Sequence, residues 1–181
     1  KGQRRIFNFL QYGKTKAAIL MASRGSGKSV GCSAAAAALI CSRPCSVGLF
    51  GANLEKAIKL NRTIRHFIGN SVFSRWIDKK IDSKREFHLK FPDSWCCGNP
   101  SSETARGDHY DYGLVDEMSI IDNRIFKGVI YSTFRRRGIH WIGLSTPAGA
   151  KGVFWQYWNN SGPGKRHTRL MITIEDQDWL E

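Results

Sequence analysis

Long apolar runs are absent from this sequence of 181 residues. The longest candidate, AAAAALI at 34–40, is far shorter than the ~20 residues that a membrane-spanning helix requires. Its alanine content favours a buried helix instead. The sequence also shows no secretory signal peptide. We therefore expect no membrane partner.

Acidic residues are scarce, since 15 Asp and Glu stand against 28 Lys and Arg, for a formal net charge of +13. A surplus of this size favours a polyanionic partner, nucleic acid above all, because each neutralised phosphate releases counterions. The alternative is a basic protein that binds no nucleic acid.

Cysteine is too sparse and too irregular for a disulfide framework. The five cysteines are an odd number, and Cys96 and Cys97 are adjacent, which indicates a reducing compartment. Cys41 and Cys45 lie four apart, but no second pair with metal-ligand spacing follows. We predict buried or half-buried thiols and no metal site at these positions.

Internal repeats and low-complexity linkers are missing as well, and 181 residues suffice for one domain with a sizeable core. Hydrophobic residues make up 41% of the sequence, which is typical of a soluble globular protein. We predict a single domain over 1–181. Because the sequence begins with Lys1 and not Met, we expect it to be part of a longer protein.

Segments of two kinds alternate along the chain. Short apolar runs predict strands, and amphipathic or alanine-rich segments predict helices. The strands are expected at 17–22, 46–52, 112–116, 138–145 and 166–175, and the helices at 2–12, 28–42, 53–68, 123–134 and 152–160. This alternation predicts an α/β fold with a mostly parallel central sheet flanked by helices. The segment 97–111, rich in turn-forming residues, predicts a loop.

The segment KKIDSKREFHLKF departs from this alternation. A turn at Asp82-Ser83 precedes apolar residues at every second position, namely Phe87, Leu89 and Phe91. This pattern predicts a half-exposed β-hairpin insertion near 79–92.

The stretch MASRGSGKS, 21–29, follows the first predicted strand and precedes the alanine-rich helix. Apart from Ala22 at the first Gly position, it matches the phosphate-loop pattern G-x-x-x-x-G-K-[ST]. Glycines let such a loop curl around phosphate, and the N–H groups at the start of the helix bind it. Lys28 is expected to hold the β- and γ-phosphates and Ser29 to ligate Mg²⁺. The predicted nucleotide-binding residues are Ser23, Arg24, Gly25, Ser26, Gly27, Lys28 and Ser29.

The segment YGLVDE, 112–117, is an apolar strand that ends in two carboxylates. We predict that Asp116 holds the hydrated Mg²⁺ and that Glu117 polarises the attacking water. The alternative is a strand that ends in a solvated acidic turn. Adjacent Asp and Glu favour hydrolysis that drives mechanical work over small-molecule phosphoryl transfer.

The segment GLSTPAG, 143–149, is a third apolar strand with a polar exit. The hydroxyls of Ser145 and Thr146 could sense the γ-phosphate from a strand that neighbours the loop. The alternative is an ordinary strand-to-turn exit, for which Thr-Pro-x-Gly is common.

Three segments together resemble a known family: MASRGSGKS at 21–29, TARGDHYDYGLVDEMSIID at 104–122 and GLSTPAGAKGVFWQYW at 143–158. In order, spacing and surrounding residues they are similar to the ATPase domain of the large terminase subunit, the DNA-packaging motor of tailed bacteriophages. The resemblance covers nearly the whole chain. It implies a P-loop NTPase fold of the ASCE type, ATP and Mg²⁺ as cofactors, and ATP hydrolysis that translocates double-stranded DNA.

The resemblance also implies roles for single residues. An arginine within the loop is common in that family, so Arg24 is expected to contact phosphates or sense the catalytic state. Gln3 is expected to read the adenine edge, with a solvated helix-start residue as the alternative. Arg106 matches an arginine that some packaging motors insert into a neighbour's active site. Its alternative is a structural ion pair with Asp108 or Asp111.

Ser145 and Thr146 match the family motif that couples hydrolysis to movement. The implied partners are double-stranded DNA, further copies of the chain in a ring, the portal protein and a small terminase subunit, in the host cell cytoplasm at the procapsid. Complete large terminases also carry a C-terminal nuclease. The segment TIEDQDWLE at 173–181 is similar to the exit from the ATPase core, so we expect no nuclease activity from this chain.

Basic clusters are the candidates for contact with DNA. Each cluster alone is more often a solvated face, but together with the net charge they favour a DNA track. The candidates are Lys79, Lys80, Lys84, Arg85, Arg135, Arg136 and Arg137, with Lys165 and Arg166 as a further pair. This hypothesis predicts a steep loss of DNA affinity with salt.

Two other functions fit part of the sequence. A helicase-like, nucleic-acid-dependent ATPase would need a second motor domain with its own arginine finger, and this sequence contains none. A basic nucleic-acid-binding domain with a vestigial nucleotide site would show no ATP turnover, or turnover that is insensitive to the loss of Lys28.

Overall fold

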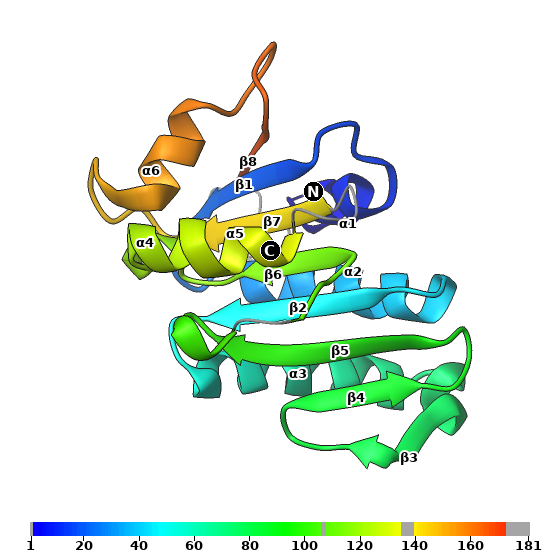
Figure 1. Cartoon of the computed structure of the whole chain (residues 1–181). Helices are drawn as coiled ribbons and strands as arrows, with labels where there is room; N and C mark the ends of the chain where they lie inside the picture. The colour runs from blue at the N-terminus through cyan, green and yellow to red at the C-terminus, as the bar shows by residue number, and fades with distance from the viewer. Residues whose placement is uncertain (1, 106–107, 135–139, 173–181) are drawn as a thin grey trace.

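The computed structural model describes residues 2–105, 108–134 and 140–172 (Figure 1). The α-helices are α1 (Gly2–Tyr12), α2 (Lys28–Ser42), α3 (Leu54–Gly69), α4 (Asn123–Ile125), α5 (Tyr131–Phe134) and α6 (Gly152–Asn159). The strands are β1 (Ala17–Ala22), β2 (Ser46–Gly51), β3 (Ile77–Asp82), β4 (Glu86–Leu89), β5 (Ser94–Pro100), β6 (Tyr112–Val115), β7 (His140–Ser145) and β8 (Thr168–Ile172). The short 3-10 helices are η1 (Val72–Trp76), η2 (Glu103–Ala105) and η3 (Met118–Ile120), and η4 (Phe126–Ile130) is a π-helix.

Within the described residues, the strands form one sheet of eight in the order β3-β4-β5-β2-β6-β7-β1-β8. In the order of the sheet, each strand from β5 through β2, β6, β7 and β1 to β8 is parallel to its neighbour. Strand β4 runs antiparallel to both β3 and β5. The predicted mostly parallel sheet is therefore confirmed.

Strand β7 separates β1, which precedes the glycine-rich loop, from β6, which precedes the two carboxylates. Met21 pairs with Ser145, and Val115 pairs with both Gly143 and Phe50. These registers place the carboxyl ends of β1, β7, β6 and β2 at one edge of the sheet. Ligand sites of open parallel sheets form at this edge.

Helices cover both faces of the sheet (Figure 1). The core under α1, α2 and α3 includes Ile64, and the core on the other face includes Phe126 and Phe154. Successive residues of β1 enter opposite cores, Leu20 the first and Ile19 the second, as the two-residue period of a strand requires. In the described part of the chain, no helix combines the length and the apolar character needed to cross a bilayer.

The predicted hairpin insertion is present as β3 and β4, joined by a turn at 83–85. Phe87 and Leu89 are buried as expected, but Phe91 is 59% exposed because β4 ends before it, in the turn that leads to β5. The predicted loop at 97–111 is wrong for 97–100, which form the second half of β5. Gly98 and Asn99 pair with Leu49 and Phe50 of β2, and this pairing overrides their turn propensity, whereas the pairing with β4 ends at Cys97.

Candidate active site

The glycine-rich loop leaves the buried end of β1 and turns directly into α2. Gly25 and Gly27 have φ angles of +77° and +70°, a left-handed conformation that side chains other than glycine's disfavour. The Gly31 N–H donates to Gly27 O at 2.8 Å, so the helical hydrogen bonds begin at the end of the loop. The first N–H groups of α2, near Lys28, have no partner within the helix and can bind an anion.

Ser29 and Asp116, the two predicted metal-holding residues, are in direct contact. Ser29 Oγ donates to Asp116 Oδ2 at 3.2 Å, and Asp116 Oδ1 accepts the N–H of Glu117 at 2.9 Å. Asp116 is 8% exposed, and this burial, followed by the neighbouring Glu117 charge, raises the pKa of its carboxyl. The two hydrogen bonds and Lys28 act in the opposite direction. A buried carboxylate beside a hydroxyl supplies the oxygen ligands that Mg²⁺ prefers.

Glu117 occupies a left-handed position, with φ +53°, at the start of η3. Its Oε1 lies 3.1 Å from the Nζ of Lys56, in the first turn of α3. Sequence reasoning missed Lys56. Its signal was available, because a basic residue just after β2 lies at the same edge of the sheet as the residues just after β6.

Ser145 lies at the end of β7 and is 1% exposed. Its Oγ donates to Ser119 Oγ at 2.6 Å and accepts the Ser119 N–H at 3.2 Å. Ser119 follows Glu117 by two residues, so β7 is hydrogen-bonded to the turn that carries the second carboxylate. Sequence reasoning did not single out Ser119. Thr146 is half-buried beside Ser145.

A cavity of about 710 Å³ connects these elements. It lies at the carboxyl edge of the sheet and is lined by Ser23, Arg24, Lys28, Ser29, Lys56, Lys59, Leu60, Thr63, Asp116, Glu117, Ser119, Ile120, Ser145, Thr146, Pro147 and Ala148. Its volume falls within the range of small-molecule sites.

The lining has the chemistry of a phosphate site. The hydroxyl oxygens of Ser23, in the lining, and of Ser26, in the same loop, are buried and have no hydrogen-bond partner in the described part of the chain. Lys28 forms no ion pair with any described acidic side chain, although it lies close enough to Asp116 to affect its pKa. Buried polar groups normally have partners, so these donors fit a bound anion. The residues present therefore fit a nucleotide with Mg²⁺.

Several predicted site residues lie outside the part of the chain that the structure describes. Arg106 and the cluster Arg135, Arg136 and Arg137 lie outside the described residues, as does the tail at 173–181. Gln3 lies in α1, but its side chain is outside the described part.

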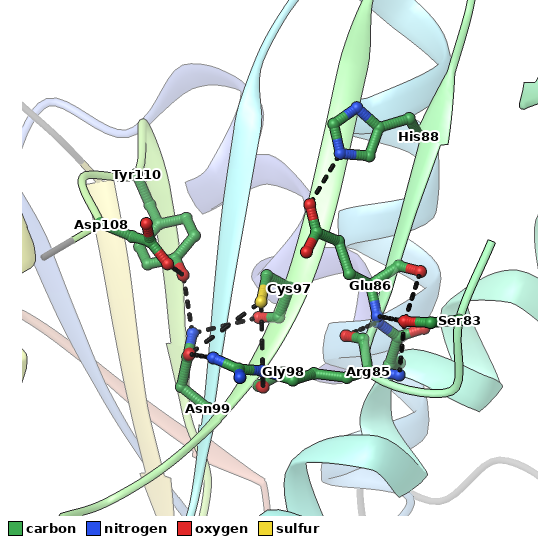
Figure 2. Close-up of polar contacts among 10 residues, drawn as sticks. Ser83, Arg85, Glu86, His88, Cys97, Gly98, Asn99, Asp108 and Tyr110 are labelled. Carbon is green, nitrogen blue, oxygen red and sulfur yellow. Dashed lines mark hydrogen bonds and ion pairs between the residues drawn. The ribbon is translucent and has the colours of Figure 1, made fainter. Parts of the chain in front are cut away.

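The candidate DNA-contacting residues of the hairpin differ in their surroundings. Lys79 and Lys80 on β3 and Lys84 and Arg85 in the turn are all exposed. The Arg85 guanidinium instead donates to Gly98 O at 2.9 Å and to Asn99 Oδ1 at 2.8 Å, as Figure 2 shows. These contacts anchor the turn to β5.

The Arg85 contacts continue into the core (Figure 2). Asn99 Nδ2 donates to the hydroxyl of Tyr110 at 2.7 Å, and that hydroxyl donates to Asp108 Oδ2 at 3.1 Å. Asn99 is 2% exposed and Tyr110 is fully buried. The hairpin turn and the segment before β6 are thus joined by side-chain hydrogen bonds.

The cysteines lie in the protein interior, as predicted. Cys32, Cys45, Cys96 and Cys97 are buried and Cys41 is half-buried, all as free thiols. Burial raises the pKa of the Cys45 thiol to about 12. Among the described residues, no group of three or more His, Cys, Asp or Glu side chains could hold a metal ion.

At the level of sequence, neither a protein-family model nor a curated protein matches this chain. Solved structures do match it in fold. The large terminase ATPase domain of Thermus phage P74-26 has a TM-score of 0.75 and 16% identity, over 92% of this chain and 79% of that one. The large terminase of HK97 bacteriophage has a TM-score of 0.75 and 11% identity, over 93% of this chain and 38% of that one.

The large terminase from a third phage, a thermophilic bacteriophage, has a TM-score of 0.79 and 13% identity, over 100% of this chain and 47% of that one. That protein has also been solved in complex with ATP-gamma-S and with ADP. The chain thus spans less than half the length of this protein and of the HK97 protein. Its predicted P-loop fold of the ASCE type is confirmed, and over nearly its whole length its fold is similar to those of phage large terminase ATPase domains.

Proposed function

We propose that this chain is the ATP-hydrolysing motor domain of a large terminase subunit, which translocates double-stranded DNA into a procapsid. One observation carries the proposal: the hydrogen bond between Ser29 and Asp116 joins the phosphate loop to the acidic strand, with Glu117 beside it. The terminase-like fold supports the same conclusion, as does the nucleotide bound to one of the similar phage terminases.

In this proposal the loop N–H groups, Lys28 and Arg24 bind the phosphates, and Gln3 reads the adenine. Ser29 and Asp116 hold Mg²⁺, which neutralises charge on the phosphate oxygens when bound. Glu117 orients the attacking water and accepts its proton. Arg106 stabilises the charge that develops on the transferred phosphoryl group.

Movement is coupled to hydrolysis through Ser145 and Thr146. The hydrogen bonds between Ser145 and Ser119 support this role, because a shift of Glu117 on phosphate release would be passed to β7. Exposed lysines of the hairpin, Lys79, Lys80 and Lys84, contact the DNA backbone. The chain assembles into a ring of copies at the procapsid, in the host cytoplasm. Its other partners are the portal protein and a small terminase subunit. We expect no DNA cleavage by this stretch of chain.

The test is Mg²⁺-dependent ATP turnover together with binding of a fluorescent nucleotide. Lys28→Ala should abolish binding, whereas Glu117→Gln should bind nucleotide normally and lose at least ~100-fold in turnover. Turnover that survives Lys28→Ala, or a wild-type chain that neither binds nor hydrolyses ATP, would favour the nucleic-acid-binding domain with a vestigial site. ATP-driven strand separation of duplex DNA would favour the helicase.

A further inference from the structure

A second cavity, of about 370 Å³, lies between α5, α6 and the loop that leads to β8. Its lining combines three rings, those of Tyr131, Tyr157 and His167, with two basic residues, Lys165 and Arg166, and two amide side chains. Among the described residues, no acidic side chain belongs to this lining. We call this cavity the basic aromatic pocket, and its volume suits one small ligand.

The basic aromatic pocket is separate from the proposed nucleotide site. The two cavities share no lining residue. Tyr157 packs on Trp141, with 5.3 Å between the ring centroids, and Trp141 pairs with Ala17 at the start of β1. Because the phosphate loop follows the other end of β1, the pocket lies toward the amino edge of the sheet. A ligand bound there would leave the phosphate loop free.

The loop that carries both basic residues is held by hydrogen bonds at its two ends. The Gly162 N–H donates to His167 O at 2.9 Å, and the Lys165 N–H donates to Gly162 O at 3.1 Å. The Arg169 guanidinium, on β8, donates to Trp158 O at 2.9 Å and lies over the Trp158 ring at 4.6 Å from its centroid. The backbone of the loop is therefore preformed, which lowers the entropy lost when a ligand binds.

The protonation states of the lining leave the pocket cationic at pH 7. Burial, followed by the neighbouring Arg166 charge, lowers the pKa of His167, so its ring is neutral. Burial raises the pKa of Tyr157 to about 12, so its hydroxyl keeps its proton and can donate. Neither Lys165 nor Arg166 forms an ion pair with an acidic side chain of the described residues. Their charges are thus available to an anion.

A phosphate group fits these donors. Lysine and arginine bind phosphate through charge-assisted hydrogen bonds, and a phenol adds a neutral donor. We propose that the basic aromatic pocket binds the phosphate of a nucleotide, at a site distinct from the ATP cavity, with Lys165 and Arg166 as the charged contacts. The same phosphate chemistry occurs in the backbone of DNA and in a free mononucleotide, and the experiment distinguishes these sources. The inference does not depend on ATP hydrolysis, because no residue of the proposed hydrolytic site takes part.

The experiment follows the backbone amide signals of the isotope-labelled chain by NMR. Thymidine monophosphate or a short DNA duplex is added in the presence of excess ADP and Mg²⁺. The wild type is compared with the double variant Lys165→Met, Arg166→Met and with the control double variant Lys151→Met, Arg62→Met. Both control residues are exposed and line neither cavity, so this variant loses the same charge elsewhere on the chain.

In the wild type, the amide signals of 165–167 should shift when the second ligand is added. The Lys165→Met, Arg166→Met chain should bind at least about fivefold more weakly, and the control should change by less than about twofold. Shifts with thymidine monophosphate assign the site to a free nucleotide, and shifts with the duplex alone assign it to the DNA backbone.

Signals of 165–167 that stay unchanged with both probes would overturn the proposal, as would an equal loss of affinity in the two double variants. The proposed function is tested separately, by the shift of the Gly25 and Gly27 amides when ADP and Mg²⁺ are first added. An unchanged phosphate loop would count against the ATPase and leave the readout at 165–167 intact.

Discussion

Ser29 Oγ donates a hydrogen bond of 3.2 Å to Asp116 Oδ2, although 87 residues separate them in sequence. The contact exists because β1 and β6 both end at the carboxyl edge of the sheet, on either side of β7. It leaves Asp116 buried, with its carboxyl pKa raised. The burial of this carboxyl therefore costs the ligand-free chain some free energy of unfolding, in an arrangement that suits a bound ligand.

Asp116→Asn should stabilise the ligand-free chain at pH 7. Because burial raises the folded-state pKa of Asp116, the folded state favours the protonated carboxyl. The stability that this proton confers is fully present below the unfolded pKa of about 3.9 and is lost as pH rises through the raised folded pKa. Asparagine does not titrate, so its advantage should be largest at pH 7 and vanish at low pH.

The measurement is the free energy of unfolding by urea, taken at several pH values between 3 and 7. An Asp116→Asn chain that is less stable than the wild type at pH 7 would contradict the burial argument.

Ser145→Ala should destabilise the chain by about 1–3 kcal/mol, because the N–H and hydroxyl of Ser119 both lose their partner. If the contact also orients Glu117, turnover should fall by roughly 10- to 100-fold while nucleotide affinity persists. A double-mutant cycle with Ser119→Ala isolates the bond between the two hydroxyls, because the backbone N–H of residue 119 is kept, and we expect a coupling energy of about 0.5–3 kcal/mol. Additive effects of the two substitutions would show that the bond between the two hydroxyls contributes nothing of its own.

Arg85→Met should destabilise the fold by about 1–3 kcal/mol, because it removes the donor from the buried Asn99 Oδ1 and from Gly98 O. Lys84→Met removes the same charge one residue earlier, from a side chain that makes neither of these bonds, and should change stability by less than about 0.5 kcal/mol. Urea unfolding of the two variants separates the anchoring role from the loss of charge. Equal free energies of unfolding for the two variants would show that the Arg85 contacts do not anchor the turn to β5.

Replacement of Lys79, Lys80 and Lys84 by alanine should weaken binding to duplex DNA uniformly across sequences. Each phosphate contact contributes roughly −0.9 to the slope of log K against log salt, so three lost contacts should reduce its magnitude by about 2 to 3. The measurement is fluorescence anisotropy of a labelled duplex over a range of salt concentrations. A slope that is unchanged in the triple variant would place the DNA contact elsewhere on the chain.

Much of the fold follows from local patterns in the sequence. Apolar runs such as 17–22 mark strands that are buried on both faces, and the helices between them force parallel connections. The positions of the loop glycines also follow locally, because the turn from β1 into α2 has left-handed backbone at Gly25 and Gly27. Strand β5 escaped prediction, since its Gly98 and Asn99 have turn propensity and only pairing with β2 makes them extended.

The sequence by itself determined the candidates for binding phosphate, metal and water: Lys28, Ser29, Asp116 and Glu117 follow from residue type and local order. Tertiary structure alone decided what surrounds them. The contacts of Glu117 with Lys56 and of Ser145 with Ser119 depend on which strands neighbour one another, and the contact of Arg85 with Asn99 depends on β4 pairing with β5. Strand order is set by the packing of the whole core, so no local pattern of residues encodes these partners.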